Sequence, residues 1–156
     1  MGKQGMKMYP FLENVKHIFL DTTFFIYHFE KEKKFLDLTT QVLNFVETGK
    51  ILCSTSCLTL MEILVNPMQK GREDLVEEYK MLFETFPNLT LIPLETSVAY
   101  TAAYFRAAYK LKPADSVQIA SAAVTGADHF LTNDKDLVKI KELNICHMDQ
   151  IVKNKE

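Results

Sequence analysis

The sequence has few of the features that mark secreted, zinc-binding or membrane-spanning proteins. It contains only three cysteines in 156 residues, Cys53, Cys57 and Cys146, and an odd number at irregular spacing argues for buried thiols in a reducing compartment rather than a disulfide framework. Structural zinc sites usually show paired ligands at short spacing, and only Cys146 with His147 hints at such a pair. The cysteines therefore give little support to a zinc site.

The chain also lacks a strong charge of one sign and a long apolar run. Its formal net charge is −2 and its pI is near 6.1, so no global basic field attracts nucleic acid, and a polyanionic partner must be held by local cations or by a metal. No uninterrupted apolar run approaches the roughly 18 residues of a membrane span, and residues 1–16 lack the compact hydrophobic segment of a signal peptide. We expect a soluble, cytoplasmic protein without membrane contact.

Hydrophobic patterning predicts strands and helices that alternate along the chain. The composition is 47% hydrophobic, which at this length suffices for one sizeable core. Short apolar runs predict strands at residues 17–20, 51–54, 89–94, 129–131 and 144–148. Apolar residues at three- and four-residue spacing, together with capping residues, predict helices at residues 22–29, 35–49, 55–66, 71–86, 95–111, 113–125 and 137–143.

Strands that alternate with helices are typical of a three-layer α/β/α fold with a central parallel sheet. We assign residues 17–152 to a single domain of this kind. Residues 1–16 mix Gly, Lys, Met and Pro without periodicity, so we expect an N-terminal extension that is partly disordered or packed along the surface.

The stretch from Leu111 to Asp136, LKPADSVQIASAAVTGADHFLTNDKD, carries the strongest local signals. Pro113 suits the first turn of a helix, where its missing N–H needs no partner, and Gly126 can take the left-handed conformation that ends one. The buried face of this helix is expected to hold Val117, Ala120 and Val124.

Two acids of this stretch are expected to face one crevice. Asp134 follows the predicted strand 129–131 and therefore lies at its carboxyl end, where parallel α/β sheets bind ligands. Asp115 lies in the first turn of the predicted helix, where the helix dipole favours an anion. Asp21 follows the strand 17–20 in the same way, and Glu62 is isolated within an otherwise apolar helix.

These carboxylates form the candidate site. Taken singly, each could be a helix cap, a turn residue or a half-exposed acid. Taken together, Asp21, Glu62, Asp115 and Asp134, with Asp136 as a fifth candidate, suggest a metal site, because crowded carboxylates repel one another and hard oxygen ligands select Mg²⁺ or Mn²⁺.

The motifs around these acids resemble those of the PIN-domain nucleases, and most closely the VapC-type toxin ribonucleases. The resemblance covers roughly residues 17–149 and rests on IFLDTTFFIY, SCLTLMEILVNP and AAYFRAAYKLKPADSVQIASAAVTGADHFLTNDKDL. It implies a PIN-like fold in which Asp21, Glu62, Asp115 and Asp134 hold the metal. Asp136 matches a position that is acidic in only some members, and we assign it as a secondary ligand or as a group that supports the ligands. Asp136 could instead cap the helix predicted to begin at Leu137.

The resemblance further implies metal-dependent hydrolysis of RNA phosphodiester bonds by the toxin of a toxin–antitoxin pair, with Mg²⁺ or Mn²⁺ as cofactor, an antitoxin protein as partner and a homodimeric assembly. A PIN-domain nuclease in RNA processing without an antitoxin, and a non-catalytic PIN-fold scaffold that binds RNA or protein, remain alternatives. Side chains near the acids that could contact substrate or the attacking water are Thr22, Thr23, Arg106, Lys110, Lys112 and Thr132. Capping and simple solvation are the competing interpretations of these residues.

Two rival enzyme or signalling classes also place an aspartate after the first strand. Haloacid-dehalogenase phosphatases need a second aspartate two positions later, where this chain has Thr23, and response-regulator receivers need an acidic pair, where Leu20 precedes Asp21. Both are therefore disfavoured.

The helices from Phe24 to Phe45 and from Leu58 to Val65 are rich in large apolar residues, and we expect their surplus to form an interface.

Overall fold

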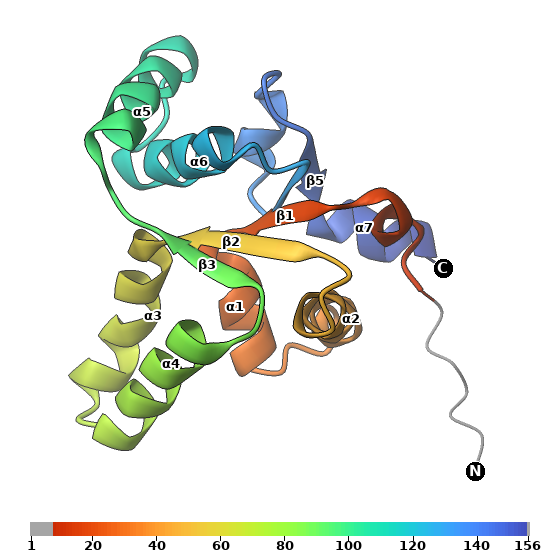
Figure 1. The fold of residues 1–156 in the computed structure, drawn as a ribbon, viewed down its shortest axis with the longest axis vertical. Helices are drawn as coiled ribbons and strands as arrows, with labels where there is room; N and C mark the ends of the chain where they lie inside the picture. Colours follow the sequence, from red (N-terminus) through yellow and green to blue (C-terminus); the bar gives the residue numbers. More distant parts are fainter. Residues whose placement is uncertain (1–7, 156) are drawn as a thin grey trace.

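A five-stranded parallel sheet forms the centre of the molecule in the computed structural model, which describes residues 8–155 (Figure 1). Residues 1–7 of the predicted extension lie outside the described residues. The strands are β1 (His17–Leu20), β2 (Leu52–Ser56), β3 (Leu89–Ile92), β4 (His129–Thr132) and β5 (Ile145–His147), in the order β3-β2-β1-β4-β5. Every neighbouring pair is parallel, so the predicted parallel α/β fold is confirmed.

Helices cover both faces of this sheet, as a three-layer fold requires. The described helices are α1 (Thr22–Phe29), α2 (Leu36–Glu47), α3 (Cys57–Gln69), α4 (Glu73–Thr85), α5 (Thr96–Tyr109), α6 (Pro113–Thr125) and α7 (Met148–Lys155). Figure 1 shows α1 to α4 on one face and α5 with α6 on the other. No helix within residues 8–155 has the length and apolar character needed to cross a membrane.

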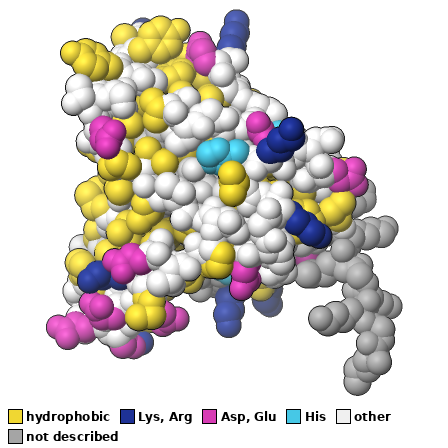
Figure 2. All heavy atoms as spheres, in the orientation of Figure 1, with side chains coloured by type: hydrophobic (Ala, Val, Ile, Leu, Met, Phe, Trp, Pro, Cys, Tyr) yellow, Lys and Arg dark blue, Asp and Glu magenta, His cyan; other side chains and the backbone are white. Residues whose placement is uncertain are grey.

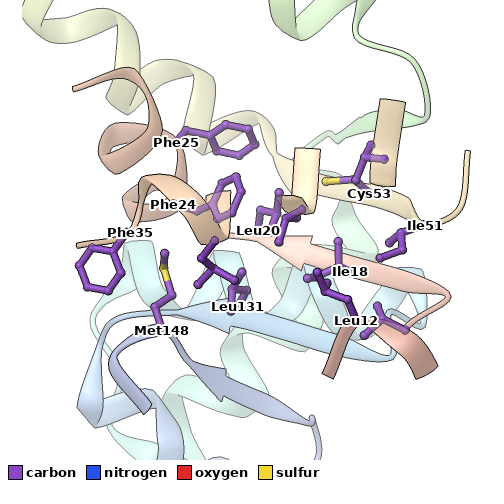
Figure 3. Close-up of a cluster of buried hydrophobic side chains, with 14 of the residues drawn as sticks. Leu12, Ile18, Leu20, Phe24, Phe25, Phe35, Ile51, Cys53, Leu131 and Met148 are labelled. Atoms are coloured by element: carbon purple, nitrogen blue, oxygen red, sulfur yellow. The ribbon is translucent and has the colours of Figure 1, made fainter. Parts of the chain in front are cut away.

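The alternation of side chains along β1 divides the core between the two faces. Ile18 and Leu20 belong to the larger hydrophobic cluster beneath α1 and α2 (Figure 3), whereas Phe19 joins Phe105 and Ile119 on the face covered by α5 and α6. Phe19 stacks on Phe130 of β4 with ring centroids 5.3 Å apart. All three β1 residues are fully buried, and each such side chain contributes about 1.5–3 kcal/mol of hydrophobic stabilisation. The central strand is therefore held from both sides.

The segment before β1 takes part in the core. Tyr9, Leu12 and Val15 are all buried, and a 3₁₀ helix, η1 (Pro10–Asn14), carries the middle one. Their three-residue spacing matches the repeat of a 3₁₀ helix, so one edge of the segment is apolar throughout. The backbone N–H of Tyr9 donates to Oε1 of Gln41 in α2 at 3.2 Å. Residues 9–15 therefore pack against the domain through one buried apolar edge, while Pro10, Glu13 and Asn14 remain exposed.

Several predicted boundaries also need correction. The helix predicted at 137–143 is a short 3₁₀ helix, η2 (Lys135–Lys139), and α7 was not predicted. Pro67 lies inside α3, which continues to Gln69 instead of ending before the proline. On α6, Val124 is 43% exposed, because the buried side of this helix carries small and polar residues in place of the expected valines. The buried α6 residues are Ser116, Gln118, Ile119, Ala120, Ser121 and Ala122.

Replacing Leu12 by alanine tests whether the segment before β1 belongs to the folding unit. Leu12 is 2% exposed within the main cluster, and loss of a buried leucine side chain typically costs about 2–5 kcal/mol. We expect the free energy of unfolding, measured by urea denaturation, to fall by this amount. Glu13→Ala, at an exposed position of the same 3₁₀ helix, should change it little. Equal stabilities of the two variants would show that the segment only rests on the domain.

Candidate active site

Two of the predicted site acids lie where the order of strands in the sheet reverses. Asp21 directly follows β1, and Asp134 is the second residue after the end of β4. The chain proceeds from β1 outward through β2 to β3, and then returns to place β4 on the other side of β1. The carboxyl ends of strands at such a switch point are where open parallel sheets bind ligands. The fold therefore brings Asp21 and Asp134 to the expected place.

Two further acids reach the same place from helices. Asp115 lies in the first turn of α6, and Glu62 projects from the middle of α3. A small cleft of about 90 Å³, which we call the acid cleft, is lined by Asp21, Thr22, Thr23, Glu62, Ala114, Asp115 and Gln118. Asp134 is not part of this lining, yet its charge acts on two of the acids that are.

Mutual repulsion appears in the pKa values of the acids. Burial raises the pKa of Asp21 to about 7, with a further increase from Asp134 and an opposing effect of hydrogen bonds from the Thr132 side chain and from the backbone N–H groups of Phe24 and Thr23. Burial also raises the pKa of Asp115, and the charges of Asp134, Glu62 and Asp136 add to the increase while Lys112 opposes it. The five predicted acids thus form one electrostatic group.

The chemistry of these side chains fits a hard divalent cation. All are carboxylates, which Mg²⁺ and Mn²⁺ prefer. Burial, and to a smaller extent neighbouring carboxylates, raise the pKa values of Asp21 and Asp115, so a cation in the cleft would stabilise their anionic forms. Within residues 8–155, however, no three His, Cys, Asp or Glu side chains converge closely enough to hold a metal ion.

Thr132 connects the two strand-end acids. Its buried hydroxyl accepts a hydrogen bond from the backbone N–H of Asp134 at 3.0 Å and bonds the carboxylate of Asp21. Because a hydroxyl can donate one bond while it accepts others, one side chain sets the positions of both acids. The predicted role of Thr132 near the site is thus a contact with the acids themselves.

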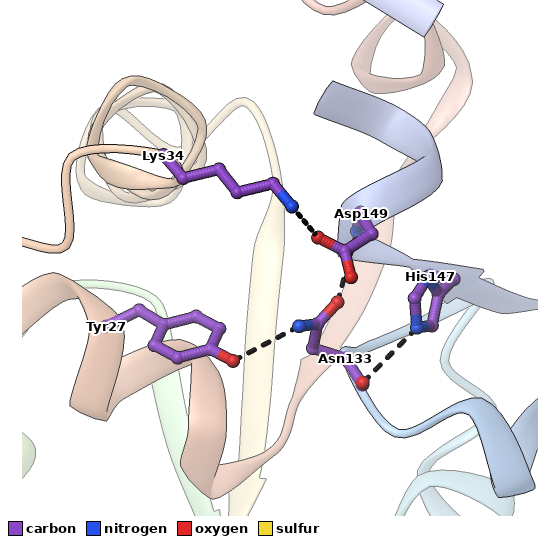
Figure 4. Close-up of polar contacts among 5 residues, drawn as sticks. All are labelled: Tyr27, Lys34, Asn133, His147 and Asp149. Atoms are coloured by element: carbon purple, nitrogen blue, oxygen red, sulfur yellow. Dashed lines mark hydrogen bonds and ion pairs between the residues drawn. The ribbon is translucent and has the colours of Figure 1, made fainter. Parts of the chain in front are cut away.

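Asn133 anchors the loop that carries Asp134 (Figure 4). Its Nδ2 donates to the Tyr27 hydroxyl of α1 at 3.1 Å, and its Oδ1 accepts from the backbone N–H of Asp149 in α7 at 3.1 Å. His147 Nε2 lies 3.2 Å from the Asn133 carbonyl oxygen, and Lys34 forms an ion pair with Asp149. Sequence analysis assigned no role to Asn133, whose only signal was its place between Thr132 and Asp134.

Asp134 rather than Asp136 caps the following 3₁₀ helix. The sequence suggested that Asp136 could cap a helix beginning at Leu137, but η2 begins at Lys135, and Oδ1 of Asp134 accepts the backbone N–H of Asp136 at 2.9 Å. The cap leaves one carboxylate oxygen of Asp134 for other partners. Asp136 is exposed in the first turn of η2.

The residues predicted to contact substrate fall into two groups. Thr22 is buried in the cleft wall and donates its hydroxyl proton to Glu62 Oε1 at 2.9 Å, and Thr23 also lines the cleft. Arg106 instead donates from Nε to the Leu111 carbonyl oxygen at 3.2 Å. It thereby closes the turn between α5 and α6, in which Lys110 has a positive φ of 55°. Lys112 lies just before α6 and acts on the pKa of Asp115.

Comparison with known proteins agrees with this architecture. The fold, a parallel sheet with acids at its switch point, is that of a PIN-like α/β/α domain, and the model of the PIN domain family matches residues 18–143. The chain therefore belongs to the PIN domain family. A comparison with curated proteins finds no match.

Solved structures of similar fold are toxin–antitoxin complexes. A toxin–antitoxin complex from Klebsiella pneumoniae has a TM-score of 0.64 and 19% identity, over 84% of this chain and 97% of the other. VapBC2 from Rickettsia felis, bound to a DNA fragment from their promoter, has a TM-score of 0.68 and 15% identity, over 84% and 98%. DNA-bound VapBC from Salmonella typhimurium has a TM-score of 0.64 and 19% identity, over 85% and 98%. At these identities the likeness establishes the fold.

The raised pKa of Asp21 predicts how stability without metal depends on pH. Because the pKa is about 7 in the folded protein and 3.8 ordinarily, the folded state keeps a proton that the unfolded state has lost between these values, so stability falls as pH rises through this window. Asp21→Asn removes the charge and keeps the Oδ1 that accepts the Phe24 N–H. We expect this variant, in EDTA at about pH 8, to be more stable than the wild type by up to about 4 kcal/mol.

The advantage of Asp21→Asn should shrink as pH falls and vanish below about pH 3, where the wild-type carboxyl is protonated in both states. Urea denaturation across this range measures it, and Glu84→Gln, at an exposed position of α4, serves as a control with no such dependence. A stability difference independent of pH would mean that the charge of Asp21 is not what destabilises the fold.

Proposed function

We propose that the protein is a Mg²⁺- or Mn²⁺-dependent endoribonuclease that acts as the toxin of a toxin–antitoxin pair. The observation that carries the proposal is the electrostatic coupling of Asp115 to Asp134 and Glu62, acids that come from different elements and surround the carboxyl ends of β1 and β4. A structural protein gains nothing from such repulsion, whereas a hydrolytic site for a phosphodiester needs a cation there.

In this proposal Asp21, Glu62, Asp115 and Asp134 would hold the cation, and Asp136 would contribute from the rim as a secondary group. When bound, the cation supplies Lewis acidity that activates water and offsets charge on the scissile phosphate. The protein's own residues orient the acids: Thr132 joins Asp21 to Asp134, and the Thr22 hydroxyl holds Glu62. The charge of Lys112 lowers the pKa of Asp115, and in this proposal the same charge attracts a phosphate.

Membership of the PIN domain family supports nuclease chemistry, and the structural likeness to toxin–antitoxin complexes supports the assignment as a toxin. The net charge of −2 argues against attraction of RNA by overall charge, so affinity for RNA would depend on local cations and the metal. RNA as the substrate, the homodimer and the antitoxin are parts of the proposal.

Exposed apolar residues support protein partners, although only some of them lie on the helices for which the sequence predicted an interface. The large apolar residues of α1 and α2 are mostly core, and Ile26 is the one described as exposed. The α3 prediction fares better, since Met61 and Val65 are 57% and 46% exposed. Tyr100 and Tyr104 of α5 are exposed as well, and Figure 2 shows hydrophobic side chains along the edge where α5 and α3 lie. These surfaces suit a second copy and an antitoxin.

RNA cleavage by the purified protein should require a divalent cation, and Asp115→Asn should abolish it. Asp115 is half-buried among other acids, so the amide keeps its shape while it removes a metal-binding charge. We expect a loss of turnover of at least about 100-fold, measured on a labelled RNA with Mg²⁺ or Mn²⁺. Glu84→Gln removes an exposed acid of α4 and should cleave normally. Undiminished cleavage in excess EDTA would contradict metal dependence.

Asp134→Asn should impair Mn²⁺ binding far more than Asp136→Asn. The amide at 134 keeps the Oδ1 that caps η2, so the helix survives while the ligand charge is lost. Asp136 is exposed and acts on Asp115 only as the last of the repulsive charges. Calorimetric titration of both folded variants with Mn²⁺ measures the difference. If Asp136→Asn has the weaker affinity, the fourth ligand is Asp136.

A further inference from the structure

Behind the acid cleft lies a chain of buried hydrogen bonds that no motif predicted. It consists of Thr55 at the end of β2, Thr59 in α3, Thr22 in α1 and Gln118 in α6, all of which are buried. Gln118 Nε2 lies 2.9 Å from the Thr59 hydroxyl and 3.2 Å from the Thr22 hydroxyl. These hydrogen bonds therefore join four elements, β2, α3, α1 and α6, around the site.

The two ends of this chain determine where its protons go. Thr55 Oγ1 lies 2.6 Å from the Leu20 carbonyl oxygen, and Thr22 Oγ1 lies 2.9 Å from Glu62 Oε1. The Thr55 hydroxyl donates to the carbonyl oxygen and the Thr22 hydroxyl donates to the carboxylate, so each threonine has used its single proton. The 2.8 Å contact between the Thr55 and Thr59 hydroxyls then uses the proton of Thr59.

This proton count fixes the orientation of the Gln118 side-chain amide. The oxygens of Thr22 and Thr59 have no proton left for Gln118, so both must accept from it, and only the NH₂ group can donate twice. If the amide were turned around, Gln118 Oε1 would face the hydroxyl oxygens of Thr22 and Thr59, and no proton would lie between these three acceptors. Gln118 is 5% exposed, and its Oε1 has no hydrogen-bond partner among the residues that the structure describes.

A buried amide oxygen without a partner costs about 1–3 kcal/mol, yet this one belongs to a residue that lines the acid cleft. Among the described residues, two other buried polar atoms also lack a hydrogen-bond partner, His129 Nδ1 and Asp149 Oδ1, and the second of these forms an ion pair with Lys34. Gln118 differs from both because it lines the same cleft as Asp21, Glu62 and Asp115, where the proposed cation would bind. Small hydrated cations such as Mg²⁺ keep several of their waters in proteins, and those waters are hydrogen-bond donors.

We propose that Gln118 is a positioning residue of the acid cleft, whose Oε1 accepts a hydrogen bond from a water molecule that enters with the divalent cation. The inference rests on the proposed function for the presence of a cation there. Its Nε2 group, through Thr22, also orients the carboxylate of Glu62. Gln118 thus holds a ligand side chain with one end of its amide and a water of the cation with the other.

Calorimetric titration with Mn²⁺ and thermal unfolding in EDTA test this role. Gln118→Met preserves the length of the side chain and removes both polar ends. We expect its dissociation constant for Mn²⁺ to rise about tenfold, as for other groups that orient metal ligands, while its melting temperature in EDTA stays near that of the wild type because an unsatisfied acceptor has been removed.

The matched control is Gln41→Met, since Gln41 is also a buried glutamine but lies in α2 and bonds Tyr9. It should lower the melting temperature in EDTA and leave the Mn²⁺ dissociation constant unchanged. Thr59→Val, which removes an acceptor of the Gln118 amide outside the cleft lining, should weaken Mn²⁺ binding several-fold, and Thr59→Ser should restore it.

Equal Mn²⁺ affinities of the wild type, Gln118→Met and Thr59→Val would overturn the role of Gln118 while leaving the metal site intact. A wild-type protein that binds no Mn²⁺ would overturn the proposed function and this inference together. The two failures are therefore distinguishable in one set of titrations.

Discussion

Burial of the Asp21 carboxylate close to a second acid, Asp134, at the ends of two adjacent parallel strands is the constraint on which the other features of the site depend. Asp21 is 7% exposed, and the pairing of Leu20 with Leu131 aligns the ends of β1 and β4, so its charge cannot move away from that of Asp134. Hydrogen bonds offset part of the cost: the Thr132 side chain and two backbone N–H groups all lower the pKa of Asp21, although burial prevails. The fold holds this unfavourable arrangement because neighbouring elements are tied to it by other contacts.

Those ties explain the composition of α6. A helix that carries Asp115 to the cleft must approach α5 and the sheet closely. Ala120, Ser121 and Ala122 are fully buried, at positions where larger side chains would hold the helix away. Gln118 is the large polar exception on this buried side, and its bonds to Thr22 and Thr59 fasten α6 to α1 and α3. The position of Asp115 relative to Glu62 thus follows from hydrogen bonds deep in the protein.

Sequence analysis predicted the order of elements and the grouping of the acids because both depend on local signals. Apolar runs mark β1 and β4, and α6 begins at Pro113 and ends before Gly126 as expected. An acid that directly follows a parallel strand must lie at the carboxyl edge of the sheet. The buried segment at Tyr9 to Val15 escaped because a three-residue repeat over seven positions is too short to distinguish from a loop. The Gln118 network escaped for a different reason. Its residues come from three distant parts of the sequence, Thr22, Thr55 with Thr59, and Gln118. Threonine and glutamine also give no sign of burial until tertiary contacts are known.

The ends of the chain show that the family's sequence pattern and the physical unit of folding differ. The matched region, residues 18–143, leaves out Leu12, His147 and Met148, yet Leu12 and Met148 belong to the same cluster as Phe24 and Leu20. His147 contacts the Asn133 carbonyl oxygen, and the backbone N–H of Asp149 donates to the Asn133 side chain. The loop that carries Asp134 is thus anchored by α1 on one side and by residues beyond the matched region on the other. Because a family pattern records the residues that chemistry requires, the support of those residues can come from segments that the pattern omits.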